Sequence, residues 1–431
     1  MLPLYAFCAE FVLTGGKDRQ GRWNRGIIIL YGALLAVPLL LGLAWLSERI
    51  LHPRNFGREF DVLQRLMTES RVMFDYMAWT LAPSLDSLTL YHDDIVLSRG
   101  LLSPPTTILA IAGIAGMLGA AFLLRRKMPL LALGVFWFFG GHLLTGTIIP
   151  LILVFEHRNY FPSAGLLLAA TSLLALEGPR LRGKAIFLGA SCIFAFYAFT
   201  TSLRSLEWSN PLLQAGAEAS KRPDSSAAQY EYARILLNSS VNGDPKPLQE
   251  KAFGILERMA ANPDAEATHN QLLIVYSTEL GHPINPAWWD SMIAKLGARP
   301  PTSTEVTALI ALLRCYDDNF CARDVDHLGM AFHAATQHTS GYAKLHVAYG
   351  DFALNYLHDT DLAEKQYREA VRQAPDDARS LASLIEFLAQ MGRVEEARAE
   401  LVRLGTINRF GILDKEIARL DKEIARRSTS G

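Results

Sequence analysis

Residues 26–46 read GIIILYGALLAVPLLLGLAWL and contain no Asp, Glu, Lys or Arg. An α-helix rises about 1.5 Å per residue, so this stretch can cross the roughly 30 Å hydrocarbon core of a bilayer. Four more windows lack these charged residues, at 105–124, 128–155, 159–176 and 185–203. Because the cores of soluble proteins rarely supply five such windows so close together, residues 1–203 are predicted to form an all-α membrane domain with about five spans.

The charge is divided unevenly between the two halves of the chain. Residues 1–200 hold 17 basic and 12 acidic residues, whereas residues 201–431 hold 25 basic and 31 acidic ones. Near-neutrality without a basic cluster in the second half excludes a nucleic-acid binder. The 31 Gly, 20 Pro and 4 Cys are ordinary for this length and exclude collagenous, disordered and disulfide-scaffold chains.

Basic residues between the apolar windows predict the orientation. They form three dense clusters, and alternating spans would put all three on one side, which the positive-inside rule makes cytoplasmic. Residues 47–104, 156–158 and 204–431 then face outward, so we expect a bacterial inner-membrane protein whose second half lies in the periplasm. The clusters are Lys17, Arg19, Arg22 and Arg25; Arg125, Arg126 and Lys127; and Arg180, Arg182 and Lys184.

The window at 128–155 is too long for a simple span, since as a straight helix it would measure about 42 Å. We expect it either to tilt strongly or to break near Gly140 and Gly141 or near Pro150. The imidazole of His142 at this depth is either a functional group or a hydrogen-bond partner of a neighbouring helix.

Residues 1–13 are apolar but too short to span, and they lack the basic start and cleavage site of a signal peptide. They are typical of the end of a helix and count as a partial N-terminal span. We therefore expect the chain to begin inside a larger membrane domain.

The outward segment 47–104 carries two further patterns. Apolar residues recur every three or four positions over 60–81, which predicts an amphipathic helix lying in the membrane interface. His92, Asp93 and Asp94 follow, and such a group could hold a divalent cation or act as a base. No second set of ligands stands at a suitable spacing, so a solvated turn is the competing interpretation, and no metal or other cofactor is predicted.

The second half contains helical repeats. Ala363 begins the pattern A-x3-Y-x2-A-x4-P, which is typical of the second helix of a tetratricopeptide repeat and the proline after it. The next unit keeps the period of about 34 residues and has small residues at Gly392 and Ala397, where two antiparallel helices approach closely. The best repeats are predicted at about 345–377 and 378–411.

The remainder of residues 204–431 fits this pattern more loosely. Four prolines and a Trp pair in 283–301 predict an interruption of the array. We predict four or five hairpins in an α-solenoid, whose concave surface either binds a protein partner or only packs. The heptad LDKEIAR occurs at 413–419 and again at 420–426, which predicts a helix that caps the last repeat or, alternatively, a dimer contact.

The four cysteines fall into two classes. Cys8 and Cys192 lie in apolar segments and are interpreted as packing residues. Cys315 and Cys321 bracket a predicted turn between helices, so in an oxidising periplasm they are candidates for a disulfide. Free thiols are the alternative, and a zinc site would need two more ligands.

One turn between two apolar windows carries a motif. Residues 156–165 read EHRNYFPSAG, which resembles the E-R-R-x-Y-x-P-S-x-G signature of the transmembrane and tetratricopeptide-repeat O-mannosyltransferases and their bacterial relatives, with His157 in place of the usual Arg. Two other stretches resemble the outer-loop segment and the exit from the last span in that family. They are Arg65–Thr68 with Arg71, Tyr76 and Pro83, and Arg204 with Trp208, Leu212 and Pro223.

The resemblance implies a C-type glycosyltransferase fold and hexosyl transfer from a polyprenyl-phosphate donor on the outer membrane face. It also implies catalytic acidic residues in the first outer loop, which are expected upstream of this chain. The chain is then expected to correspond to the C-terminal part of such an enzyme, and no catalytic residue is predicted within it.

Four residues of the turn are predicted to bind the lipid phosphate, namely Glu156, His157, Arg158 and Tyr160. The guanidinium of Arg158 offers a bidentate fork for phosphate, and Glu156 could orient that fork by pairing with it. The alternative interpretation is an arginine that extends to the membrane surface beside an interfacial Tyr.

Two functions compete on this evidence. The first is a membrane glycosyltransferase of polyprenyl-phosphate-linked sugars, or part of one, whose repeats bind the acceptor protein. The second is a noncatalytic membrane-anchored repeat scaffold for envelope, pilus or polysaccharide assembly. Partners are accordingly a membrane lipid or lipid-linked sugar and a protein, and no nucleic acid.

The orientation can be tested with fusions to alkaline phosphatase, which is active only outside the cytoplasm. We expect an active fusion after residue 210, and an inactive control fusion after Lys127 on the cytoplasmic side. Inactivity of the fusion after residue 210 would overturn the predicted topology.

Overall fold

The computed structural model describes residues 2–17, 20–22, 24–51, 60–143, 145–146, 149, 151–175, 181–239, 246–338 and 342–428. Over these residues the protein is all-α and has no β-strand, as predicted. It divides into two compact units, Met1–Ala228 and Gln229–Gly431. The division falls after the boundary predicted at 203/204, because the helix that follows the last apolar window makes buried polar contacts with the first unit.

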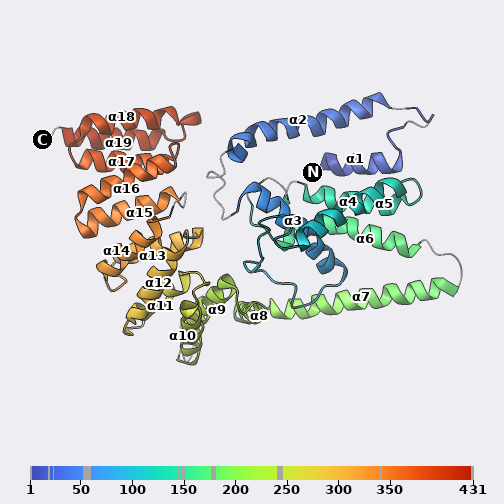
Figure 1. Ribbon diagram of the computed structural model, residues 1–431, viewed down its shortest axis with the longest axis horizontal. Coiled ribbons are helices and arrows are strands. Elements are labelled where there is room, and N and C mark those ends of the chain that lie inside the picture. Colours follow the sequence, from blue (N-terminus) through green and yellow to red (C-terminus); the bar gives the residue numbers. More distant parts are fainter. Residues whose placement is uncertain are drawn as a thin grey trace. The chain divides into compact units, whose positions relative to one another are not determined.

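The first unit holds helices α1 to α8 (Figure 1). Three of them contain a stretch long and apolar enough to cross a membrane, namely Arg25–Ala44, Thr106–Leu124 and Phe187–Glu207. These stretches correspond to the predicted windows 26–46, 105–124 and 185–203. The helices are α1 (Leu2–Leu13), α2 (Arg25–Leu51), α3 (Val62–Leu81), α4 (Thr106–Leu124), α5 (Pro129–His142), α6 (Tyr160–Ala175), α7 (Leu181–Glu207) and α8 (Pro211–Lys221), with the 3-10 turn η2 (Glu156–Asn159) before α6.

The other two predicted windows give shorter helices. Helix α5 has 14 residues and α6 has 16, about 21 and 24 Å in length. Window 128–155 breaks after His142, which is one of the two outcomes expected for it, and the described residues between 143 and 155 are not helical. A Cβ on Gly134 would lie 2.3 Å from the Gly165 carbonyl oxygen. The backbones of α5 and α6 therefore touch, and this contact excludes any larger residue.

Helix α3 differs from the amphipathic helix predicted for 60–81. An amphipathic helix in the membrane interface would turn its polar side to water. In α3 the polar residues Arg65, Thr68 and Glu69 are buried, whereas Leu63 is 64% exposed. These polar side chains bind groups inside the bundle, as described below.

The second unit is a row of antiparallel helical hairpins (Figure 1). Alternate helices α11, α13, α15, α17 and α19 pack against one another in turn, which is the stacking of the predicted α-solenoid. The row consists of α9 (Ser226–Ser239), α10 (Lys246–Ala261), α11 (Thr268–Glu279), α12 (Pro286–Ala298), α13 (Ser303–Asp317), α14 (Val325–Thr336), α15 (Ala343–Phe352), the π-helical turn η4 (Ala353–Leu357), α16 (Thr360–Gln373), α17 (Ala378–Gln390), α18 (Val394–Thr406), the 3-10 turn η5 (Arg409–Gly411) and α19 (Asp414–Ser428).

Helix α12 corrects the interpretation of the proline-rich segment 283–301. Pro286 occupies the first helical position, where a missing N–H costs nothing, and Asn285 caps the helix by accepting a hydrogen bond from Ala287 N. Trp289 is 1% exposed and lies in the core with side chains of α13 and α14. The segment is therefore the second helix of a hairpin and does not interrupt the array.

Helices α15 and α16 approach each other most closely at Gly350. A Cβ on this residue would lie 2.8 Å from the ring of Tyr367, whose hydroxyl donates to Asp351 Oδ1 at 2.7 Å. Ala363 and Ala370 on the facing side of α16 are fully buried. The alanines of the repeat pattern thus stand where the helices touch. The close approach expected at Gly392 is wrong, because this residue lies in the turn between α17 and α18 with a φ of +73° and nothing within 4 Å of an added Cβ.

Helix α19 closes the array. From the second copy of the duplicated heptad, Leu420 and Ile424 are fully buried in the core formed with α17 and α18. Their counterparts in the first copy, Leu413 and Ile417, are only partly buried. The preceding turn is held by Asn408, whose Oδ1 accepts from Leu413 N at 2.9 Å.

The contact at Gly350 predicts opposite effects for two Gly→Ala changes in helices. Gly350→Ala should lower the free energy of unfolding by about 1–3 kcal/mol, because the new methyl group meets Tyr367. Gly254→Ala in α10, where nothing lies within 4 Å of the added Cβ, should raise it by about 0.5–1 kcal/mol. Urea unfolding of the full chain in detergent, followed by circular dichroism, measures both, and a neutral Gly350→Ala would contradict the packing.

Candidate functional site

The break after α5 leaves main-chain carbonyl groups without helical partners, and Arg65 of α3 donates to them. Its side chain is fully buried. Nη2 donates to Thr145 O at 2.6 Å, and Nη1 donates to Leu151 O. The same guanidinium pairs with Glu69 Oε1 at 2.6 Å. Burial raises the pKa of the Glu69 carboxyl to about 7 against the opposing effect of Arg65, so this pair is held in a poorly solvated place.

Tyr76, about three turns after Arg65 on α3, holds the end of the same non-helical segment. Its hydroxyl accepts from Phe155 N at 3.0 Å and donates to Phe155 O at 3.2 Å. His142 stacks on Tyr76 with ring centroids 5.0 Å apart, and its Nε2 lies 3.3 Å from Asn159 Oδ1. The structure therefore agrees with the second interpretation of His142, a hydrogen-bond partner of a neighbouring element.

Beside this turn lies a cleft of about 870 Å³ within the first unit. It is bordered by the end of α3, the segment at 83–90, the turn η2 and the end of α7. Three of the four residues predicted to bind phosphate line it, namely Glu156, His157 and Tyr160. Arg204 also lines it, and this volume is ordinary for a site that binds a small molecule or a head group.

Arg204 is the centre of a charged network. Its Nη1 lies 2.9 Å from Glu207 Oε2 and 2.8 Å from Glu218 Oε1. Glu218 is 1% exposed, and its other oxygen accepts from Thr89 Oγ1 at 2.6 Å and Leu90 N at 2.9 Å. Arg204 Nη2 is buried and has no hydrogen-bond partner among the described residues. This nitrogen is therefore an unsatisfied donor on a residue that lines the cleft.

Glu156 faces this network from the other side of the cleft. Burial raises the pKa of its carboxyl, and the guanidinium of Arg204 and the backbone of Thr89 act in the opposite direction. Its Oε1 is buried and, within the described part of the chain, accepts no hydrogen bond. The cleft thus presents a buried cationic donor and a buried carboxylate acceptor.

Arg158 does not line the cleft with the rest of the predicted set. Its Nη1 donates to Ile152 O, and its guanidinium lies 5.6 Å from the centroid of the Phe155 ring. The charged groups that act on the pKa of Glu156 are Arg204, Glu218 and Lys221. A sequence signal for Arg204 exists, because it is the first charge after the apolar window 185–203.

The outer-loop candidates serve different purposes. Asp94 Oδ2 pairs with Arg222 Nη1 at 2.7 Å. Asp93 accepts from Ser225 Oγ and from a backbone N–H in the first turn of α9. Across the described ranges no group of His, Cys, Asp and Glu is suited to a metal ion. His92 packs against an aromatic ring, so these three residues fasten the loop and form no common site.

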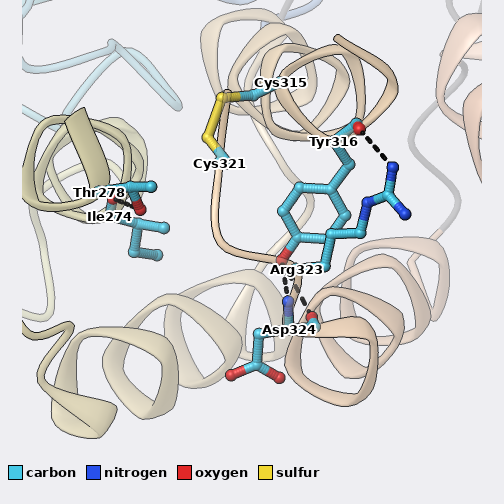
Figure 2. The surroundings of a disulfide bond; sticks show 7 residues. All are labelled: Ile274, Thr278, Cys315, Tyr316, Cys321, Arg323 and Asp324. Carbon is cyan, nitrogen blue, oxygen red and sulfur yellow. Dashed lines mark hydrogen bonds between the residues drawn. A yellow bond between two sulfur atoms is a disulfide. The ribbon is translucent and has the colours of Figure 1, made fainter. Parts of the chain in front are cut away.

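Cys315 and Cys321 are joined by a disulfide that closes the turn between α13 and α14, with Cα atoms 5.3 Å apart (Figure 2). Beside it, the hydroxyl of Tyr316 accepts from Asp324 N at 2.8 Å and donates to Asp324 O at 3.1 Å. The disulfide and the two hydrogen bonds between Tyr316 and Asp324 hold the same turn. We therefore describe the disulfide as a structural clamp.

Comparison with known proteins bears on the second unit. Residues 356–412 match the family model of the tetratricopeptide repeat. This range includes α16, α17 and α18, so the predicted repeat character is confirmed there. Neither the curated proteins nor the solved structures include a match to this chain. The protein is thus an all-α chain with tetratricopeptide repeats, which generally mediate protein–protein interaction, and with candidate membrane-spanning helices.

The role of Arg65 predicts a large effect of its removal. Arg65→Gln should lower the free energy of unfolding by about 3–5 kcal/mol, because it leaves Glu69 buried without its partner. Arg71→Gln on the same helix is the matched control, since Arg71 bonds to Val96 O near the surface, and should change it by less than about 0.5 kcal/mol. Thermal unfolding of the full chain in detergent compares them, and equal shifts would contradict the buried role.

Proposed function

We propose that this protein is a membrane-anchored tetratricopeptide-repeat protein whose first unit binds the phosphate head group of a polyprenyl-phosphate-linked sugar. The observation that carries the proposal is the buried, unpartnered Nη2 of Arg204 in a cleft of about 870 Å³. A guanidinium nitrogen without an acceptor binds an anion more strongly inside a cleft than in water.

The surroundings of Arg204 favour binding of an external anion at Nη2, because the two carboxylates nearby both contact Nη1. Glu207 and Glu218 both contact Nη1, so they hold the guanidinium in place and leave Nη2 without an acceptor among the described residues. Lys221 Nζ lies 2.6 Å from Glu207 Oε2 and offsets part of that negative charge. The site is therefore preorganised before a ligand arrives.

The attachment of the cleft to apolar helices supports a lipid-linked ligand. Arg204 lies near the end of α7, directly after a stretch with no charged residue, so a phosphate bound there would be close to the membrane surface with its lipid chain among the helices. The resemblance of residues 156–165 to the O-mannosyltransferase signature points to the same ligand class. On this proposal the chain corresponds to the C-terminal part of a hexosyltransferase located in a bacterial inner membrane.

The repeats supply the second part of the proposed function. A solenoid of this kind binds extended partners along its concave side, so we propose that the array holds the protein acceptor outside the cytoplasm. A noncatalytic scaffold for envelope, pilus or polysaccharide assembly is the second candidate, and the match of 356–412 to a protein-binding repeat favours it equally.

The two candidates differ in whether the full chain binds a lipid phosphate. In detergent, polyprenyl monophosphate should bind the wild-type protein, and Arg204→Lys should weaken binding about tenfold, since it keeps the charge but removes the second donor nitrogen. Arg158→Lys is the matched control and should change the affinity less than about twofold. Titration followed by intrinsic tryptophan fluorescence measures both.

Two results would contradict the proposal. Failure of the wild-type protein to bind polyprenyl monophosphate would favour the scaffold. A larger loss with Arg158→Lys than with Arg204→Lys would return the phosphate role to the residue predicted from the sequence motif.

A further inference from the structure

The anion-binding role of Arg204 leaves a second unsatisfied atom in the cleft. Glu156 Oε1 is buried and has no hydrogen-bond partner in the part of the chain that the structure describes. An unsatisfied buried acceptor is costly. A phosphate cannot satisfy this atom, because it would bring a second negative charge. A ligand with neutral donors, such as hydroxyl groups, would satisfy it.

The same cleft has an aromatic wall of fixed orientation. Trp79 at the end of α3 lines the cleft. His92 stacks on its ring with centroids 4.9 Å apart and an interplanar angle of 23°. Tyr76 meets it edge to face, at 5.6 Å and 80°. One face and one edge of the indole are therefore occupied by the protein, and the remaining side borders the cleft.

His92 contributes to this arrangement through its ring face, and the backbone of Thr89 also acts on its imidazole. Both of its ring nitrogens are buried and, among the described residues, accept or donate no hydrogen bond. Desolvation lowers the pKa of the imidazole, and Arg222 acts in the same direction, so the ring is neutral near pH 7. A neutral ring packed flat on an indole is a positioning group for that indole.

From these contacts we infer that the cleft contains a sugar subsite, in which a pyranose ring lies against Trp79 and donates hydroxyl hydrogen bonds to Glu156. A pyranose has an apolar face of C–H groups and an edge of hydroxyl groups. The first fits an aromatic ring and the second fits a carboxylate acceptor. This inference rests on the proposed function, since Arg204 holds the phosphate to which the sugar is attached.

The subsite gives separate roles to residues that the sequence grouped together. Glu156 is assigned to the sugar and Arg204 to the phosphate, while His92 supports Trp79 from behind. Asp93 and Asp94 hold the loop that carries His92, through Ser225 and Arg222. Trp79 recognises the sugar of the head group, and Arg204 recognises its phosphate.

The test compares two probes with the full chain in detergent, namely polyprenyl monophosphate and polyprenyl-phosphate mannose. Wild-type protein should bind the mannose-bearing lipid about tenfold more tightly than the bare phosphate. Trp79→Leu and Glu156→Gln should each remove this difference while changing the affinity for the bare phosphate less than about twofold. Trp79→Phe, which keeps an aromatic face, and His92→Phe, which keeps the stacking ring, should retain most of it.

The outcomes separate the subsite from the proposed function. Equal binding of both probes by the wild-type protein would overturn the sugar subsite and leave the phosphate site standing. Binding of neither probe would overturn both. Equal losses for the two probes with Glu156→Gln would also overturn the subsite. Where Trp79→Leu fails to fold in thermal unfolding, Glu156→Gln, which keeps the side-chain size, decides the result.

Discussion

The first unit depends on how the chain satisfies its main-chain polar groups where helix α5 stops. In a bilayer, non-helical backbone is tolerated only where protein groups replace the lost hydrogen bonds. Arg65, Tyr76 and Arg158 do this for the described residues of 143–155. The requirement explains why α3 buries its polar side and exposes Leu63. It also explains why the cleft has a defined shape, since the turn that borders it has little freedom left.

A single carboxylate joins the cleft to helix α8 of the first unit. Glu218 of α8 contacts Arg204 with one oxygen and Thr89 and Leu90 with the other. Thr89 and Arg204 both line the cleft, so a ligand that displaces either residue acts on α8 through two buried bonds. Such bonds are strong in a poorly solvated place and costly to leave unmade. Glu218 therefore connects α8 to two residues that line the cleft.

Helices marked by residue spacing and composition were predictable from the sequence. Contacts between side chains far apart in the sequence were not. The charge-free windows and the spacing from Ala363 to Pro375 identify helices and their packing faces, because both reflect local geometry. The prolines around Trp289 misled the prediction, since a proline at the first helical position has the same letter as one that ends a helix. Glu218 lies 129 residues after Thr89 and fourteen residues after Arg204, and periodicity contains no information on such contacts. Arg158 stood in the motif and yet is not among the residues that line the cleft.

The duplicated heptad at the end of the chain has a consequence for the helix that closes the array. Since LDKEIAR occurs twice, a shift of α19 by seven residues would present Leu413 and Ile417 to the groove now filled by Leu420 and Ile424 with identical chemistry. The side chains alone cannot select between these two alignments. The selection is made by the bond from Leu413 N to Asn408 and by the length of the turn before it. The register of the final helix is thus a property of the seven residues between α18 and α19, and insertion of one further heptad would extend the helix without altering its docking.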